Sequence, residues 1–195
     1  TDLGNVKTKL QELEAYHGVV LHPNKERVWV IHPLSTAPTN FAVRCRGKVH
    51  WGNCAWCSLG VAALLQPAEV QISTTSGAEG QPLELVVRDG TLITGGHVAH
   101  FPVPMAKAWE NVIYTCSLML LFRNEQEVDS WCSRHHIAKG DVQPAAKVFA
   151  FAREWYGNHL SMTWRKWTNE EAARIFENHG LTGSIWEIPR STGRF

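Results

Sequence analysis

Residues 51–65, WGNCAWCSLGVAALL, organise the rest of this chain. Two thiols, Cys54 and Cys57, lie between tryptophans and lead directly into an apolar segment that is typical of a buried helix. The pair Gly52-Asn53 supplies a turn, so we expect Cys54 just before the helix and Cys57 near its first turn. Free N–H groups at a helix start favour a thiolate over a thiol, which makes Cys57 a candidate reactive group.

A Cys-x-x-Cys pair is compatible with several kinds of site. Thioredoxin-like redox sites use this spacing, and so does half of a zinc site. A thiolate is also the form of cysteine that binds soft metals. Two inert, buried cysteines beside tryptophans are a further interpretation, because free cysteine is often a core residue. The motif alone does not choose among these interpretations.

Composition restricts the class of protein. The 195 residues predict one domain, 1–195, that buries a core without disulfides. Nineteen basic and 18 acidic side chains leave a net charge of +1, so we expect no nucleic-acid partner and no anionic membrane surface. The sequence has no apolar run of membrane-spanning length and no signal-peptide pattern. Its five cysteines are too few for a disulfide scaffold, and their number is odd. These features predict a cytoplasmic protein that acts on a small molecule, and they indicate no particular oligomeric state.

The order of apolar patterns predicts an α+β fold with a mixed or antiparallel sheet core flanked by helices. Besides an amphipathic opening helix that ends near residues 17–18, the sequence predicts helices after Cys54 and at 105–112, 125–134, 142–156 and 169–178, the last with a Thr168/Glu171 capping box. Strands are expected at 27–31, 41–45, 70–75, 83–87, 91–94 and 97–100, and a central apolar strand at 113–122.

Nine tryptophans predict either an aromatic-walled pocket or a Trp-rich core, and composition does not choose between them. Trp51 and Trp56 flank the two cysteines and are candidate pocket walls. The segment Trp164-Arg-Lys-Trp167 interleaves basic and aromatic residues, as nucleic-acid surfaces do. In a chain that is nearly neutral overall, packing or a pocket lid is the better interpretation of this segment.

The pair His97-x-x-His100 offers a second possible ligand set. Together with Cys54 and Cys57 it would make a zinc or copper site of two sulfurs and two nitrogens. Residues three apart on a regular strand point to opposite faces, so this site requires an irregular segment, which Gly95-Gly96 allows. Otherwise His97 and His100 are candidate pocket residues. His135-His136 is expected as a solvated pair at a helix end.

Residues 41–136 resemble the alkylmercury (organomercurial) lyases. The resemblance depends on Ala55-Trp-Cys57, which opens a helix after a strand, on Cys116 in an apolar segment, and on Asp129-Ser-Trp131, which follows Cys116 at the family's spacing. It implies an organomercurial lyase-like fold in which Cys57 and Cys116 are paired thiolates. In that family protonation splits a carbon–mercury bond, which releases a hydrocarbon and leaves Hg(II) on the thiolates. Mercury is soft and prefers sulfur, and the same ligands suit copper or zinc. No resident cofactor is required.

The sequence departs from the family at the group that supplies the proton. The family has an aspartate three residues after its first cysteine, and this chain has Gly60 there. Cys54 is therefore the leading substitute, as third sulfur ligand and proton donor. Ser58, His97 and Glu79 are weaker candidates, since a general acid must lie within hydrogen-bonding reach of its target.

Two further departures leave other functions open. Too few residues precede Cys57 for the family's N-terminal winged-helix-like part, and the Trp-rich stretch 156–186 has no counterpart in the family. A non-catalytic thiol protein that binds Hg(II) or copper is one alternative. A lyase-like fold with a redox-active Cys54/Cys57 pair, or with a different carbon substrate, is another.

Overall fold

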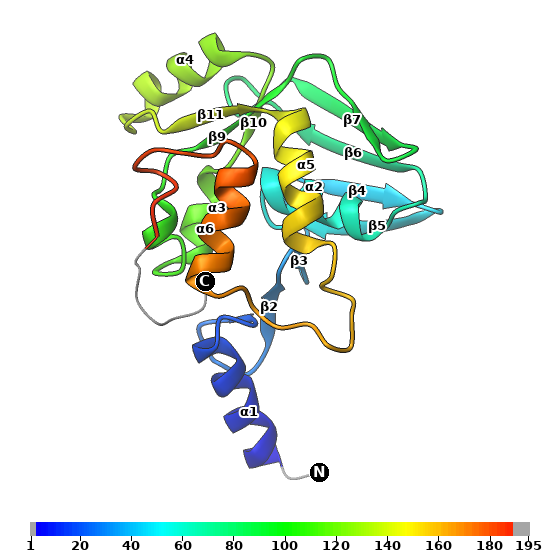
Figure 1. The fold of residues 1–195 in the computed structure, drawn as a ribbon, viewed down its shortest axis with the longest axis vertical. Coiled ribbons are helices and arrows are strands. Elements are labelled where there is room, and N and C mark those ends of the chain that lie inside the picture. The colour runs from blue at the N-terminus through cyan, green and yellow to red at the C-terminus, as the bar shows by residue number, and fades with distance from the viewer. Residues whose placement is uncertain (1–2, 189–195) are drawn as a thin grey trace.

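The computed structural model describes residues 3–188, which form two antiparallel sheets with helices packed against them (Figure 1). The larger sheet has the strand order β1-β2-β3-β5-β4-β6-β7-β8, and the smaller has the order β10-β9-β11. The strands are β1 Val20–Leu21, β2 Val28–Ile31, β3 Leu34–Ser35, β4 Ala42–Cys45, β5 Lys48–Gly52, β6 Val70–Thr75, β7 Pro82–Arg88, β8 Thr91–Ile93, β9 Val98–Phe101, β10 Leu121–Phe122 and β11 Asp141–Pro144. The predicted α+β class is confirmed.

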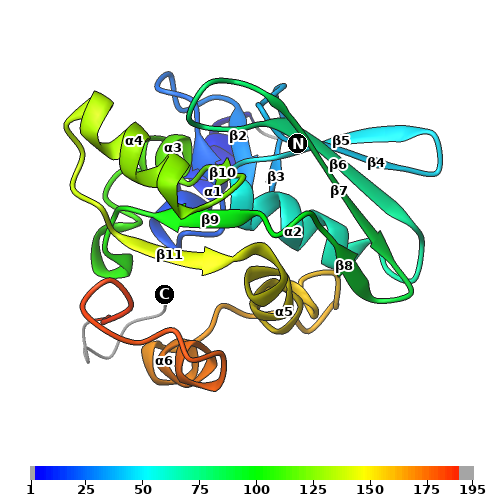
Figure 2. The same cartoon turned by 90° about the horizontal axis from the view of Figure 1, so that it is seen from above.

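The helices are α1 Leu3–Ala15, α2 Ala55–Leu64, α3 Val112–Leu118, α4 Glu125–His135, α5 Ala145–Tyr156 and α6 Asn169–Asn178, with a 3-10 turn at Met105–Lys107. Helix α2 packs on the larger sheet, α5 packs on α2, and α4 packs on the smaller sheet, whereas α1 extends from the body. Figure 2 shows α2 between the larger sheet and α5, so the centre of the molecule has the layers sheet, α2 and α5. No helix within residues 3–188 has the length and apolar character needed to cross a membrane.

Helix α2 is buried on all sides because its sequence is apolar on all sides. Every residue from Ala55 to Ala62 is buried, including the polar Ser58. The strand β5 ends directly against this helix at Gly52, where an added Cβ would lie 2.5 Å from the Ser58 Cα atom. Glycine is therefore required at position 52 for the close approach of strand and helix, in addition to the turn that the sequence predicts.

Several predicted elements are confirmed by the structure. The hairpin β6/β7 pairs from Val70↔Val87 to Thr75↔Pro82. Helix α6 has the expected capping box between Thr168 and Glu171. At the end of α4, His136 takes the left-handed conformation of a C-cap. Cys45 is buried on β4 and lies outside the helices.

The segment 113–122 differs from the prediction of a central strand. Asn111 caps a short helix, α3, by accepting a hydrogen bond from the Tyr114 N–H, and Cys116 lies in this helix. Only Leu121–Phe122 forms a strand. Apolar density alone does not distinguish a buried strand from a buried helix, which explains the error. The helix predicted at 105–112 is absent, because residues 105–111 contain only a 3-10 turn and α3 begins at Val112. The helix predicted at 142–156 begins at Ala145, because residues 141–144 form β11.

The tryptophans supply both a core and a cavity wall. Trp56 stacks on Phe151 with ring centroids 4.8 Å apart, and Trp155 stacks on Phe176 at 5.5 Å. These contacts join α2, α5 and α6 through aromatic side chains. The Trp-rich core and the aromatic-walled pocket, between which composition did not choose, are therefore both present.

Candidate functional site

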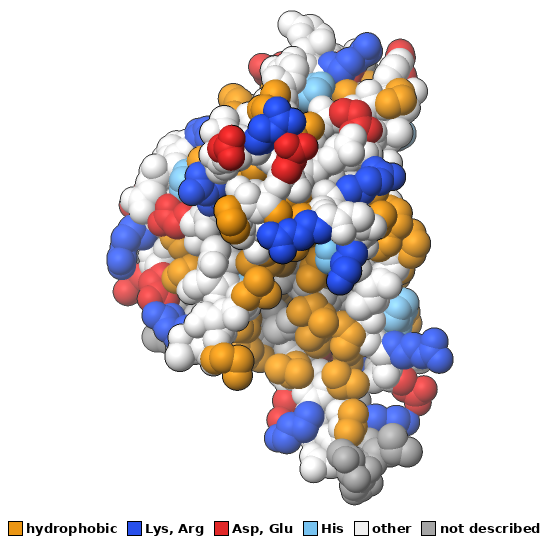
Figure 3. Space-filling view, turned by 90° about the vertical axis from the view of Figure 1, so that its right-hand side faces the viewer, with side chains coloured by type: hydrophobic (Ala, Val, Ile, Leu, Met, Phe, Trp, Pro, Cys, Tyr) orange, Lys and Arg blue, Asp and Glu red, His pale blue; other side chains and the backbone are white. Residues whose placement is uncertain are grey.

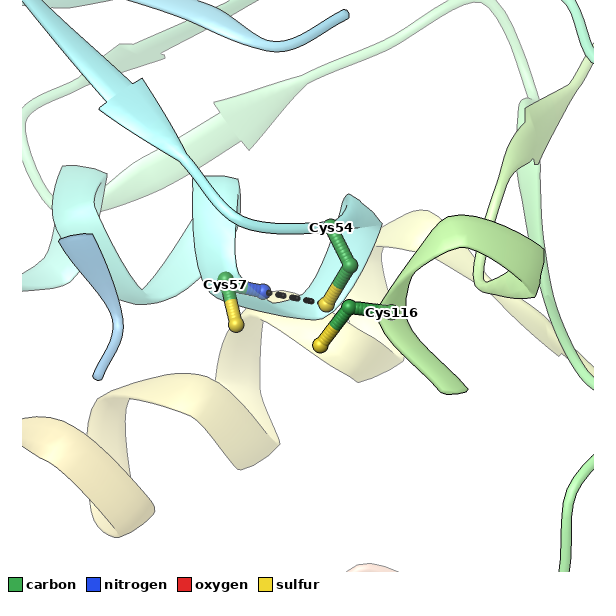
Figure 4. A group of neighbouring side chains, drawn as sticks. All are labelled: Cys54, Cys57 and Cys116. Atoms are coloured by element: carbon green, nitrogen blue, oxygen red, sulfur yellow. Dashed lines mark hydrogen bonds between the residues drawn. The ribbon is translucent and has the colours of Figure 1, made fainter. Parts of the chain in front are cut away.

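Three buried cysteines lie together at the start of α2. The sulfur atoms of Cys54, Cys57 and Cys116 all lie within 4.8 Å of one another. Figure 4 shows Cys54 and Cys57 on the first turn of α2 and Cys116 beside them on α3. Their exposed fractions are 0%, 1% and 6%. The structure thus brings together all three cysteines that the sequence nominated, including the pair chosen on the resemblance.

Local hydrogen bonds hold this geometry. Cys54 is the N-cap of α2, and its Sγ accepts from the Cys57 backbone N–H at 3.3 Å. The Ala55 N–H donates to the Met119 carbonyl at 3.0 Å, which joins the start of α2 to the end of α3. The Cys54 and Met119 sulfurs are 3.9 Å apart. The expected positions of Cys54 before the helix and Cys57 in its first turn are confirmed.

The three thiols have unequal acidities. Burial raises the pKa of Cys57, but contacts with Cys116, Cys54 and His32 outweigh burial and bring this pKa well below its ordinary value. Burial raises the pKa of Cys54 well above its ordinary value. The contact with Cys54 lowers the pKa of Cys116, but the contact with Cys57 together with burial reverses this effect and raises it. The cluster is therefore arranged to hold one thiolate, on Cys57, between two thiols.

Two partners of Cys57 were not identified from the sequence. His32 Nδ1 lies 3.6 Å from Cys57 Sγ, and the Tyr156 hydroxyl lies 3.8 Å from it. His32 precedes β3, and Tyr156 is the last residue of α5, so both are distant from Cys57 in the chain. The His32-Pro33 pair marked the end of a strand and gave no signal of chemistry. Only the packing of α5 on α2 places Tyr156 at the site.

Gly60 lies in close contact with the Tyr156 ring. A Cβ at position 60 would lie 2.4 Å from Cδ2 of the Tyr156 ring. The ring therefore occupies the space into which a side chain at position 60 would extend. In this chain Tyr156 fills the region beside Cys57 that a side chain at position 60 would enter.

The cysteine cluster opens onto an aromatic cavity of about 70 Å³. Cys57 and Cys116 line this cavity, whereas Cys54 does not, so Cys54 lies behind the other two. Five of the nine tryptophans are in its wall: Trp56, Trp109, Trp155, Trp164 and Trp167. None of the described residues that line it is Asp or Glu. Trp164, Lys166 and Trp167 line the cavity, which agrees with the interpretation of the segment 164–167 as a pocket lid.

Three of the four candidate pocket residues lie elsewhere. Trp56 lines the cavity, but Trp51, His97 and His100 do not. His100 is fully buried in the smaller sheet, where its Nε2 accepts from the Gly140 N–H at 3.1 Å. His97 contacts Thr94 through Nδ1 at 2.9 Å. The mixed sulfur and nitrogen site is wrong, because within residues 3–188 the cluster able to hold a metal consists of the three cysteines alone.

The weaker candidate proton donors also point away from the cluster. The Ser58 hydroxyl donates to the Ala55 carbonyl at 2.7 Å, within its own helix. Glu79 accepts from Gln81 in the loop between β6 and β7. Of the donors nominated from sequence, only Cys54 lies in the cluster, and the Tyr156 hydroxyl joins it as a donor within reach of Cys57.

Comparison with known proteins agrees with this geometry. The family model "MerB: Alkylmercury lyase" matches residues 34–157. Among solved structures, the mercury-bound form of MerB2 matches with a TM-score of 0.66 and 19% sequence identity, covering 80% of this chain and 76% of that chain, and this likeness shows a shared fold. None of the curated proteins compared gives a significant match. Since the matched residues make up more than half of the sequence and include all three clustered cysteines, this chain belongs to the alkylmercury lyase family.

Proposed function

We propose that this chain cleaves the carbon–mercury bond of small organomercury compounds, with Cys57 and Cys116 as the mercury ligands and Cys54 as an accessory thiol. The observation that carries the proposal is the buried three-sulfur cluster at the base of an aromatic cavity. Thiolate sulfur is the preferred ligand of soft metals, and an apolar wall suits the organic group. The mercury-bound state of the MerB2 structure supports the same assignment.

The proposed reaction is a protonolysis without net oxidation or reduction. The Cys57 thiolate bonds to the mercury of an R–Hg⁺ group, and the Cys116 thiol gives up its proton as its sulfur becomes the second ligand. The carbon–mercury bond then breaks with its electron pair on carbon, which takes a proton to form R–H. Mercury(II) stays on the two thiolates. The proton that Cys116 gives up reaches the carbon through the cluster, either directly or by replacing a proton that Cys54 or the Tyr156 hydroxyl donates to the carbon.

The test is anaerobic incubation with phenylmercury, following benzene release for wild type, Cys57→Ser, Cys116→Ser, Cys54→Ser and Tyr156→Phe. We expect release from wild type and none from the Cys57 or Cys116 variants, because each lacks a ligand. Whichever of Cys54→Ser and Tyr156→Phe loses release while still binding mercury identifies the donor. The Cys45→Ser variant is the matched control, since Cys45 is buried outside the cluster. Release that persists without Cys57 contradicts the proposal.

A second function is favoured by one observation. No carboxylate is present among the described cavity-lining residues, so the group that supplies the proton in the family is missing. A thiol protein that binds mercury(II) or copper without catalysis fits this arrangement. Stoichiometric metal binding that requires Cys57 and Cys116, with no benzene released by wild type, would establish that function instead. Reversible oxidation of Cys54 and Cys57 at a physiological potential would support a redox function.

A further inference from the structure

A buried lysine lies in the wall of the cavity, and the proposed reaction does not use it. Lys166 is only 6% exposed, and it lines the same cavity as Cys57 and Cys116. Its Nζ lies 3.8 Å from the centroid of the Trp109 ring and donates to the His17 carbonyl at 3.3 Å. Burial lowers the pKa of Lys166 to about 7. With this pKa Lys166 is partly protonated near neutral pH, and an anion bound beside it would favour the protonated form.

The other polar atoms of the wall are also suited to an anion. The indole N–H groups of Trp56 and Trp164 are buried and have no hydrogen-bond partner in the described structure. An indole N–H can only donate. The described lining contains no carboxylate that would compete for these donors or repel an anion. A lysine side chain, buried indole N–H donors and aromatic faces therefore surround one small cavity.

We propose that the preferred substrate has an aromatic organic group bearing a carboxylate, which Lys166 and the Trp164 indole N–H hold while mercury sits on Cys57 and Cys116. Only the place of mercury depends on the proposed function; recognition of the carboxylate is independent of bond cleavage. A planar anion of a few atoms suits the small volume and the one lysine among the described residues of the lining. The tryptophan faces then contact the ring.

The first experiment uses mercury-free probes and tryptophan fluorescence. Benzoate and its neutral counterpart benzamide are titrated into wild type, Lys166→Met and Lys166→Arg. We expect wild type to bind benzoate about tenfold more tightly than benzamide, as a hydrogen-bonded charge pair provides. In Lys166→Met the two affinities should agree within about twofold, with benzamide binding unchanged, and Lys166→Arg should retain part of the preference. The control is Lys48→Met, which removes an exposed lysine on β5 and leaves the preference intact.

The second experiment compares kcat/KM for 4-(hydroxymercuri)benzoate and phenylmercury in the same proteins. A benzoate preference that requires Lys166, without hydrocarbon release from either compound, supports the carboxylate site and contradicts the lyase. Release from both compounds that Lys166→Met lowers equally contradicts the carboxylate site and leaves the lyase intact. A merely structural role for Lys166 lowers the thermal unfolding temperature and both affinities together. An equal loss of the two affinities in Lys166→Met, or equal binding of the two probes by wild type, overturns the proposal.

Discussion

At the scale of single residues, the contact between Gly60 and Tyr156 governs whether the family's carboxylate can be restored. Because a Cβ at position 60 would overlap the ring, we expect Gly60→Asp alone to destabilise the fold by about 3 kcal/mol or more. Tyr156→Ala removes the obstacle, so the double variant should lose less stability than the sum of the two single changes. Urea unfolding of the four proteins measures this coupling. Additive losses would show that the ring does not exclude a side chain at position 60.

The same pair also makes a prediction about activity. In the double variant a carboxylate can occupy the space beside Cys57 that the ring leaves, so benzene release from phenylmercury should exceed that of Tyr156→Ala. The matched control is Gly60→Asn with Tyr156→Ala, which has the same shape without an acidic proton. Equal release from the Asp and Asn double variants would show that position 60 does not supply the proton.

The acidity of Cys57 is a second property at this scale. Contacts with Cys116, Cys54 and His32 lower its pKa in the folded protein, so its thiolate stabilises the fold at high pH, and this contribution is lost as pH falls through the folded pKa. In His32→Phe we expect the pKa of Cys57 to rise. Iodoacetamide labelling against pH, resolved by peptide mapping, should show the midpoint for Cys57 move upward. The midpoint for Cys132, which lies in a separate core cluster, should stay constant. An unchanged Cys57 midpoint would exclude His32 as a stabilising partner.

At the scale of secondary-structure elements, the junction of β5 with α2 sets the position of the cysteine cluster. Gly52→Ala would place a methyl group 2.5 Å from the Ser58 Cα, so we expect a loss of about 1–3 kcal/mol in the free energy of unfolding. We also expect slower mercury binding, because the start of α2 must shift. Gly95→Ala is the control, since its nearest neighbour would be 3.6 Å away. Equal stability of the two variants in urea would contradict this account.

These elements also explain what the sequence could predict. Local patterns were sufficient for α2, the β6/β7 hairpin and the α6 capping box, because periodicity and capping depend on residues close in the chain. Cys116, which the resemblance paired with Cys57, lies in the same cluster as Cys57, although its element is a helix. His32 and Tyr156 reach the site only through packing of distant segments, and no local pattern marks them. Lys166 lies in the segment 164–167, which the sequence marked as packing or a pocket lid but not as a binding group.

At the scale of the whole molecule, the cavity is assembled from parts that lie far apart in the chain. Its wall comes from the end of the N-terminal segment at His17, from α2 and α3, and from the segment after α5 that carries Lys166. The bond from Lys166 to the His17 carbonyl joins the first and last of these parts directly. The site is thus sensitive to changes at the N-terminal side, although Cys57 and Cys116 are themselves buried.

Helix α1 allows this dependence to be tested. The helix extends from the body (Figure 1), it exposes Val6 and Leu13, and Figure 3 shows hydrophobic side chains gathered on the face just above it. Deletion of residues 1–12 retains the Glu14 carboxylate that accepts from the Leu21 N–H, so we expect a change of less than about 4 °C in Tm and unchanged mercury affinity. Deletion of residues 1–18 also removes His17 and Gly18 from the cavity wall. This longer deletion should weaken binding of benzoate and of phenylmercury, as measured by tryptophan fluorescence. If both deletions bind these ligands as wild type does, the N-terminal segment is not a functional part of the cavity, and the site depends only on the helices and the segment after α5.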